Sequence, residues 1–517
     1  MSKKNVVQST ALIAALTLVS KVMGFMRESL MARSFGLGAQ TDAYNAALTA
    51  TVVIMGVIGV GLNTTLVPVF SEIGQRKGMA GRRSFLNNIL SFTVIISILI
   101  TVVFFIFSPT IISFVAMGFK GEQFDLAVKL NRIGLPIVVL LAFTHVFMGY
   151  LQSLEVFGPY AVMGIPYNLV FILYLFIAGT GAEITTFMMV TVLAALMQVL
   201  IQVPAVRHSG YRLRPRVDLS DPYMRKVGML IVPILISSSI LQINIIIDKD
   251  LASIVGTGVM SALNYATKLN DLVLSVFIMA ISTVVFPMMA EAFLRNDDKG
   301  TVSILQKAIN LVMLITVPAT VGLIVLATPI VKVAFERGAF LPQDTIMTAG
   351  ALVFYAIGLM ANAMNMVLNR VYYSYRDTKT PMVVGVICVV INLAFNLLLM
   401  KPLAHKGLAL ATSIANISAT SMLFYKLREK FYDFGMKEMV VNFIKIATCA
   451  SIMGVVVYFF NYKLGSLLGT RKLVITIMLF ASMVVGATVY GVGCVMLKVP
   501  EVYILINKIK SKIITER

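Results

Sequence analysis

Leu66-Val67-Pro68-Val69-Phe70-Ser71-Glu72 lies near the end of one apolar segment, and it has a counterpart 219 residues later. The counterpart reads Val285-Phe286-Pro287-Met288-Met289-Ala290-Glu291 and lies near the end of a second apolar segment. In both copies the proline follows two apolar residues, and an acidic residue comes four positions after it. Such a match between distant segments is the first sign of a repeated unit.

Two further pairs of motifs have nearly the same spacing. Ser108-Pro109-Thr110-Ile111-Ile112 recurs as Thr328-Pro329-Ile330-Val331, and a Gly-Phe element follows each copy. These elements are Gly118-Phe119 and Gly338-Ala339-Phe340. Three agreeing offsets indicate an internal duplication with a period of about 220 residues, which many transporters have. The sequence therefore predicts a two-lobed transporter.

The composition is that of a polytopic membrane protein. Of the 517 residues, 59% are hydrophobic and only 13% are charged, and the mean hydropathy is +0.91. Soluble domains are closer to half apolar. The formal net charge of +20 would suggest nucleic acid as a partner of a soluble protein. Here Lys and Arg lie in loops that flank apolar segments, which is the positive-inside pattern, so no nucleic-acid partner is expected.

About fourteen segments of roughly 18 to 28 residues are apolar and long enough to cross a bilayer as helices. We therefore expect an all-α fold. The predicted spans are approximately 6–33, 44–70, 88–107, 130–151, 159–178, 184–205, 228–254, 262–290, 305–330, 346–370, 382–401, 405–426, 440–461 and 473–497.

The basic loops fix the expected orientation. Lys3 and Lys4, residues 76–83, residues 207–226 and the tail 498–517 are rich in Lys and Arg, and all fall on one side of an even number of spans. Positive loops favour the cytoplasmic side. The sequence thus predicts a multi-pass protein of a bacterial cytoplasmic membrane with both termini in the cytoplasm.

Each copy of the repeat contains six spans, so both copies insert the same way up, as two parallel six-helix lobes. The expected N-lobe is 1–206 and the C-lobe is 228–430. A basic cytoplasmic linker, 207–227, joins them. Residues 431–517 add two C-terminal spans and a basic tail.

Motifs for other classes of protein are missing from the sequence. It has no nucleotide-binding loop, dinucleotide fingerprint, paired-carboxylate motif or zinc spacing. Its cysteines lie in apolar stretches without a nearby partner, and its three histidines are far apart. We expect no enzyme activity, no metal and no cofactor, and a monomer in contact with membrane lipids.

Charges inside spans are the best indicators of function, because each is costly unless it faces water or a partner. Lys21 lies near the middle of the first span, and Arg27 and Glu28 follow. Lys268 and Asp271, three residues apart, share one face of span eight. A cavity lined by Lys21, Arg27 and Lys268 would attract an anion, most plausibly a phosphate. The alternatives are snorkelling for Lys21 and structural ion pairs for Arg27–Glu28 and Lys268–Asp271.

Several further motifs are specific enough to compare with known families. They are Ser20–Glu28, Phe35-Gly36-Leu37-Gly38 with Thr41-Asp42-Ala43, Phe335–Phe340 with Asp344-Thr345, Asp377–Pro381 and Lys406–Ala411. These motifs closely resemble the MurJ (MviN) family of lipid II flippases, part of the multidrug/oligosaccharidyl-lipid/polysaccharide exporter superfamily. The resemblance runs from about residue 8 to 430.

This resemblance implies fourteen helices, a central cavity, and outward transport of undecaprenyl-diphosphate-linked peptidoglycan precursor by alternating access. By motif, Arg27 and Glu28 match the family's Arg-Asp pair, and Asp42 matches its Thr-Asp-Ala aspartate. Lys268 and Asp271 match the basic and acidic residues of its span eight. Arg27, Lys268 and Lys21 would bind the diphosphate. Glu28, Asp42 and Asp271 would be acidic or gating residues of the cavity.

Two features bear on substrate and coupling. The family generally has an arginine pair in span two, where this chain has Ile54-Met55-Gly56, so one cationic ligand is missing. Asp248 resembles a sodium-binding aspartate of some members. Either Na⁺ or the membrane potential would supply the driving force.

Four other functional classes stay open at this point. One is a purely structural scaffold, although buried cations serve a scaffold poorly. A flippase for another polyprenyl-linked oligosaccharide would use the same cations. A drug or cation antiporter on the same fold would need an excess of intramembrane acids. An integral-membrane glycosyltransferase would need a carboxylate cluster and a large extramembrane groove, whereas the longest loops here have only about twenty residues.

Overall fold

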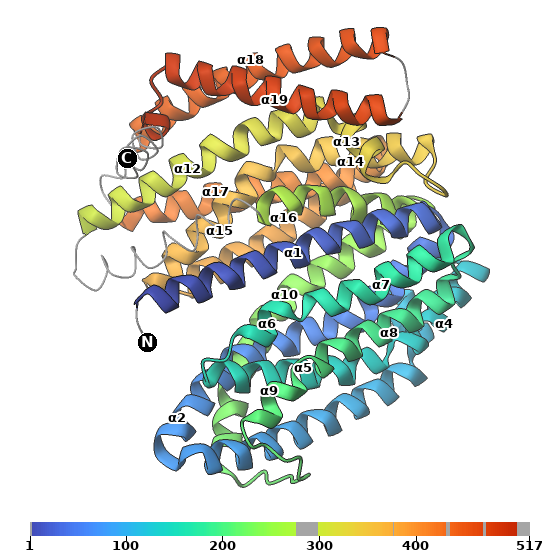
Figure 1. Ribbon diagram of the computed structural model, residues 1–517, viewed down its shortest axis with the longest axis vertical. Helices are drawn as coiled ribbons and strands as arrows, with labels where there is room; N and C mark the ends of the chain where they lie inside the picture. Colours follow the sequence, from blue (N-terminus) through green and yellow to red (C-terminus); the bar gives the residue numbers. More distant parts are fainter. Residues whose placement is uncertain (1–2, 276–297, 376, 431–434, 469–471, 504–517) are drawn as a thin grey trace. The chain divides into compact units, whose positions relative to one another are not determined.

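The computed structural model describes residues 3–275, 298–375, 377–430, 435–468 and 472–503, and every regular element in these ranges is helical (Figure 1). Residues 259–275 are also helical. The named helices are α1 Lys3–Phe35, α2 Ala39–Ile106, α3 Ser108–Val115, α4 Glu122–Gly134, α5 Pro136–Ser153, α6 Gly158–Val162, α7 Gly164–Ala178, the short 3₁₀ helix η1 Gly179–Gly181, α8 Ile184–Leu200, α9 Val203–His208, α10 Pro222–Val255, α12 Asp298–Val325, α13 Ala327–Phe335, α14 Pro342–Ile357, α15 Leu359–Ser374, α16 Lys379–Leu403, α17 His405–Lys430, α18 Met436–Leu468 and α19 Lys472–Met496.

An all-helical fold is what a bilayer imposes, because a helix satisfies its backbone hydrogen bonds internally. In the described ranges ten helices are long and apolar enough to cross a membrane, or eleven if the bent pair α14 and α15 forms one span. One of the ten, α2, covers two predicted spans. The predicted span 262–290 lies partly outside the described residues. The prediction of an all-α polytopic protein is confirmed, and the count of fourteen stays a prediction.

The long element α2 is two antiparallel arms and not one rod. A straight helix of 68 residues would be roughly 100 Å long. Gly78 breaks it, with φ of +63° and ψ of −161°. Arg82 Nε then donates a hydrogen bond to the Phe70 carbonyl at 2.9 Å, and the rings of Phe70 and Phe85 lie 5.3 Å apart. These contacts require the chain to turn back, as the basic loop between spans two and three predicts.

The described part of the repeat has matching local structure in its two copies. Helix α3 begins at Ser108 and α13 at Ala327, each after a short break that follows a long helix. The residues after these helices also make matching contacts. The Gly118 amide donates to Ser253 Oγ at 2.9 Å, and the Ala339 amide donates to the Arg33 carbonyl at 2.8 Å. Arg33 and Ser253 are themselves 220 positions apart, so the contacts follow the repeat. The motif at 285–291 lies outside the described residues.

The chain forms two compact units, residues 1–261 with 337–341, and residues 262–336 with 342–517. In the first unit, residues from α2, α5, α8–α9 and α10, among them Leu66, Phe70, Tyr150 and Val206, form an apolar core. In the second unit, Leu326, Met453, Val457 and Leu479 form a core that joins α18 and α19 to residues near α12 and α13. The predicted lobes were defined by the repeat, and their boundaries stay a prediction.

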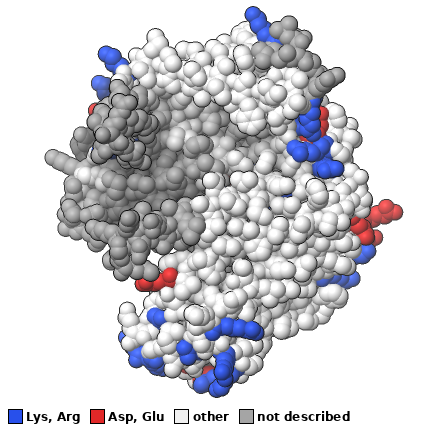
Figure 2. All heavy atoms as spheres, viewed as in Figure 1, with Lys and Arg blue, Asp and Glu red and all other residues white. Residues whose placement is uncertain are grey.

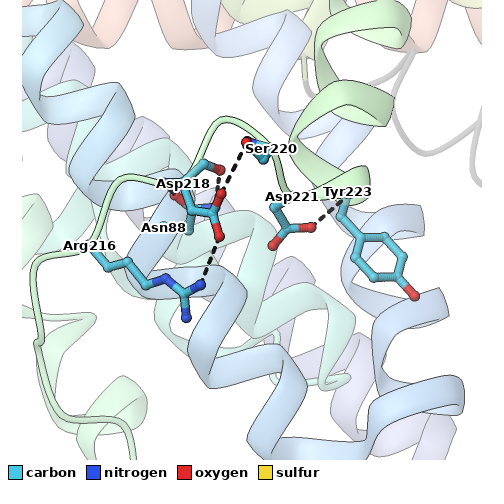
Figure 3. A network of polar contacts seen from close by, with 6 residues as sticks. All are labelled: Asn88, Arg216, Asp218, Ser220, Asp221 and Tyr223. Atoms are coloured by element: carbon cyan, nitrogen blue, oxygen red, sulfur yellow. Dashed lines mark hydrogen bonds and ion pairs between the residues drawn. The ribbon is translucent and has the colours of Figure 1, made fainter.

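The linker lies along the second arm of α2. The Asn88 side chain accepts a hydrogen bond from the Asp218 amide at 2.7 Å and donates to the Asp218 carbonyl at 2.9 Å (Figure 3). The side-chain oxygen of Asn87, Oδ1, accepts hydrogen bonds from the Tyr211 hydroxyl and the Arg214 backbone amide, both at 2.8 Å. Two asparagines of α2 therefore hold an irregular segment in one position.

Ion pairs lie in the middle of this linker and at its C-terminal end. A hydrogen bond from Arg216 holds the pKa of the Asp218 carboxyl below its ordinary value. Lys226, at the start of α10, binds Glu72 of α2, and this hydrogen bond lowers the pKa of Glu72. These half-buried carboxylates therefore favour the folded linker above their ordinary pKa, and the contribution is lost as the pH falls through the lowered values.

Candidate substrate-binding site

The predicted pair Arg27 and Glu28 forms a close ion pair in the second half of α1. Arg27 Nη2 lies 2.6 Å from Glu28 Oε1, and the two side chains are 19% and 8% exposed. Adjacent residues project about 100° apart on a helix, so the guanidinium must bend toward Glu28. The structure thus confirms the structural alternative of an internal pair. This ion pair does not exclude substrate binding by Arg27, because a guanidinium has five N–H donors.

Two aromatic rings of α7 hold the Arg27 guanidinium from another side. Its central carbon lies 5.5 Å from the centre of the Tyr167 ring and 5.1 Å from the centre of the Phe171 ring. Tyr167 and Phe171 are four residues apart, so they share one face of α7. Cation–π contacts of this kind are worth about 0.5–2 kcal/mol. Arg27 is therefore fixed in direction before any anion arrives.

Close packing of α7 on α1 makes this arrangement possible. Gly164 faces Ser20, and a β-carbon at Gly164 would overlap the serine hydroxyl. Asn168 Nδ2 donates to the Ser20 carbonyl at 3.1 Å and to the Gly164 carbonyl at 2.8 Å. Small residues and interhelical amide bonds are the usual means of close approach in membranes. Lys21, half-buried, lies next to this contact and about 9 Å from Arg27 along the helix axis.

The aromatic contacts continue away from Arg27 as a cluster. Phe187 of α8 lies at its centre, with its ring 5.3 Å from those of Phe171 and Phe35 and 5.0 Å from that of Tyr44. The Tyr44 hydroxyl lies 3.1 Å from the Thr191 hydroxyl, within hydrogen-bond distance. This cluster joins α1, α2, α7 and α8 next to the Arg27 guanidinium. The aromatic cluster was not predicted from the sequence, although the i, i+4 spacing of Tyr167 and Phe171 was a visible signal.

Asp42 has a role that its motif alone did not indicate. Its side chain is fully buried, and its carboxylate accepts hydrogen bonds from the Gly258 amide at 2.6 Å and the Ser261 amide at 2.8 Å. The Ser261 hydroxyl also donates to it. The two amides lie at the N-terminal turn of helix 259–275, where an acceptor satisfies free N–H groups. Asp42 therefore caps this helix, and its gating role stays a prediction.

The other predicted residues are more dispersed. Lys268 and Asp271 are exposed on helix 259–275 and belong to the second unit, so their convergence with Arg27 stays a prediction. Asp248 is half-buried on α10, and Asn244 Nδ2 donates to it at 3.5 Å. No cluster of three or more His, Cys, Asp or Glu suited to a metal occurs in the ranges that the structure describes. A sodium site at Asp248 also stays a prediction.

Neutral polar side chains surround span two, near the position of the missing arginine pair. A β-carbon at Gly56 would lie 2.8 Å from the Gln242 amide nitrogen, and one at Gly59 would overlap the His145 ring. His145 Nδ1 lies 3.2 Å from Asn63 Nδ2. The glycines thus provide space for larger polar groups of α5 and α10. His145 is far from the other two histidines in the sequence, which gives no sign of this contact.

The comparison with protein families decides the relationship. The family model described as "Lipid II flippase MurJ" matches residues 31–487, most of the chain. This chain belongs to the MurJ family. A probable lipid II flippase MurJ of Rickettsia prowazekii is 29% identical over 500 residues, covering 95% of this chain and 98% of the relative. One of Rhizobium tropici is 30% identical over 473 residues, covering 90% and 89%.

Solved structures show that the fold is shared as well. A lipid II flippase MurJ in an inward closed conformation matches with a TM-score of 0.80 at 23% identity, covering 94% of this chain and 99% of that one. An inward-facing multidrug transporter of the MATE family matches with a TM-score of 0.66 at 15% identity, covering 82% and 99%. Membership of the MurJ family, with the apolar helices, makes the chain a multi-pass transporter of the bacterial inner membrane and not an enzyme.

Proposed function

We propose that this chain moves lipid II from the inner to the outer leaflet of the bacterial cytoplasmic membrane by alternating access. The observation that supports this most directly is the half-buried Arg27, held by Glu28, Tyr167 and Phe171 in a protein of the MurJ family. A fixed guanidinium can bind a diphosphate through paired hydrogen bonds. Within the described residues, the Arg27 guanidinium donates to another side chain only through Nη2, which binds Glu28. Its other N–H groups can therefore reach a ligand.

In this proposal the cationic ligands differ in importance. Arg27 binds the diphosphate, and Lys21 and Lys268 add positive charge without a bidentate grip. Glu28 fixes Arg27 and limits the net charge of the empty cavity. The neutral groups near Gly56 and Gly59 replace the family's arginine pair, so this chain binds its diphosphate with fewer cations. The two relatives described above are named as probable lipid II flippases, which supports lipid II as substrate.

Complementation tests the substrate directly. We expect the wild-type gene to restore growth of a bacterium depleted of its own lipid II flippase, and lipid II to appear at the outer leaflet. A flippase for another polyprenyl-linked oligosaccharide is the second candidate. Rescue of a strain that lacks such a flippase, without rescue of the lipid II strain at normal membrane levels, would favour that candidate. Drug efflux without either rescue would favour an antiporter, which the MATE-like fold also allows.

The driving force forms part of the proposal. With no nucleotide motif in the sequence, export of a multiply charged anion must use an ion gradient or the membrane potential. A potential of 100 mV contributes roughly 2.3 kcal/mol per charge. An inside-negative potential expels the anion and also draws the cations of the empty cavity back toward the cytoplasm. Sodium bound at Asp248 is the alternative source of energy.

We also propose that both termini and the linker lie in the cytoplasm. Ser220 is exposed in the linker, and Lys120 is exposed in the loop between α3 and α4. A membrane-impermeant thiol reagent added to intact cells should leave Ser220→Cys unlabelled and should label Lys120→Cys, its control from the opposite side. Both variants should react after the cells are opened. The reverse pattern in intact cells would show that the orientation is inverted.

A further inference from the structure

A pocket of about 590 Å³ lies beside the linker, away from Arg27. Its walls come from the second arm of α2, α5, α8 and α9, and they are mainly apolar, with Phe143, Phe147, Val199 and Val203. Arg207 of α9 and Arg212 of the linker also line it, and both side chains are exposed. The pocket therefore combines an apolar interior with two cations at its opening.

Neither arginine is neutralised within the described ranges, where no ion pair involves Arg207 or Arg212. This distinguishes them from Arg216, which pairs with Asp218 at 2.7 Å. The linker backbone is also held in place. Asn87 Nδ2 donates to the Arg212 carbonyl at 3.4 Å and the Arg214 amide donates to Asn87 Oδ1. Arg212 is thus positioned at the pocket with its charge available to an anion.

The linker also exposes apolar side chains next to these arginines. Leu213, Val217 and Leu219 are 60%, 45% and 65% exposed. Segments that alternate cations with exposed apolar residues are typical of the membrane interface, where the two kinds of side chain meet headgroups and acyl chains. In Figure 2, Lys and Arg gather at the end of the first unit where Figure 1 shows the α2 bend and the linker.

We propose that this pocket binds one anionic phospholipid, with an acyl chain against Phe143, Phe147 and Val203 and the phosphate between Arg207 and Arg212. Charge complementarity selects the headgroup, because two cations without acidic partners favour a lipid with net negative charge. The apolar walls select a lipid over a soluble phosphate, since each buried methylene contributes about 0.8 kcal/mol. The site is separate from the proposed transport function and does not depend on it.

The experiment uses the full-length purified protein and phosphatidylglycerol, with binding measured by native mass spectrometry. Each arginine near a membrane surface contributes about 1 kcal/mol to the binding of anionic lipid. We therefore expect Arg207→Gln with Arg212→Gln to weaken binding by about 25-fold. Arg214→Gln is the matched control on the same segment, because Arg214 does not line the pocket, and it should change binding less than about fivefold. Val203→Trp, which places a bulky ring in the part of the pocket assigned to the acyl chain, should strongly weaken binding and leave the arginines in place.

Four results would overturn the proposal. The first is equal binding of phosphatidylglycerol and zwitterionic phosphatidylcholine. The second is undiminished binding in Val203→Trp, which would show that the lipid lies elsewhere. The third is full competition by millimolar inorganic phosphate, which would show a headgroup site without an acyl chain. Lipid II added as a competitor separates the sources of lipid phosphate. The fourth result is that lipid II displaces phosphatidylglycerol from the wild-type protein but not from the variant that lacks Arg207 and Arg212. The pocket would then be a substrate site, which contradicts the proposal.

Discussion

Arg27→Ala should abolish complementation of a flippase-depleted strain while the protein remains in the membrane at normal levels. Two effects act together. The diphosphate loses a charge-assisted hydrogen-bond donor, worth about 1.5–3 kcal/mol. Glu28, only 8% exposed, also loses its ion pair with Arg27, and removing one partner of a buried ion pair costs about 3–5 kcal/mol. Arg27→Lys should retain part of the activity, because the charge remains but the planar fork is lost.

Two further variants make this experiment decisive. Arg76→Ala removes an arginine that is 71% exposed and also paired with a glutamate, Glu72, and it should complement normally. Arg27→Ala combined with Glu28→Gln removes both partners. If this double variant complements fully, the role of Arg27 is only to neutralise Glu28, and the proposed phosphate contact is wrong. If it remains inactive with normal membrane levels, Arg27 is needed for transport itself.

Gly338→Ala should destabilise the protein severely. Gly338 has φ of +62°, and a β-carbon there would overlap the Arg33 carbonyl at the end of α1. The left-handed backbone costs an alanine about 1–2 kcal/mol, and the overlap adds about 1–3 kcal/mol. The adjacent hydrogen bond from the Ala339 amide to the Arg33 carbonyl would also be displaced. The free energy of unfolding in detergent should fall by about 2–5 kcal/mol, and complementation should fail.

Gly121→Ala is the matched control for this substitution. Gly121 has a similar φ of +54°, and nothing lies within 4 Å of the β-carbon that alanine would add. It should therefore show only the strain of its own backbone conformation, with ψ of −134°, about 1–3 kcal/mol. An equal loss in both variants would mean that the contact between residues 337–341 and α1 contributes nothing to stability. The difference between the two variants measures the contact by itself.

The sequence alone determined the class of the protein and much of its organisation. Hydropathy, basic loops and the repeat are properties of the chain read in one dimension, because a bilayer requires apolar segments of a set length and favours positive charge on one side. The same reasoning identified Arg27 and Glu28, because a charge in an apolar segment is conspicuous without any structure. The MurJ family was also recognisable from motifs such as Phe335–Phe340.

Only the tertiary structure decided which groups meet. Tyr167 and Phe171 contact Arg27 from a distant helix, and this depends on how closely Gly164 allows α7 to approach α1. The motif of Asp42 did not indicate that packing buries it as a helix cap, and its gating role stays a prediction. Contacts of this kind depend on helix rotation and on the shapes of side chains far apart in the chain. Local patterns constrain neither, so the sequence could supply the charged residue but not its surroundings.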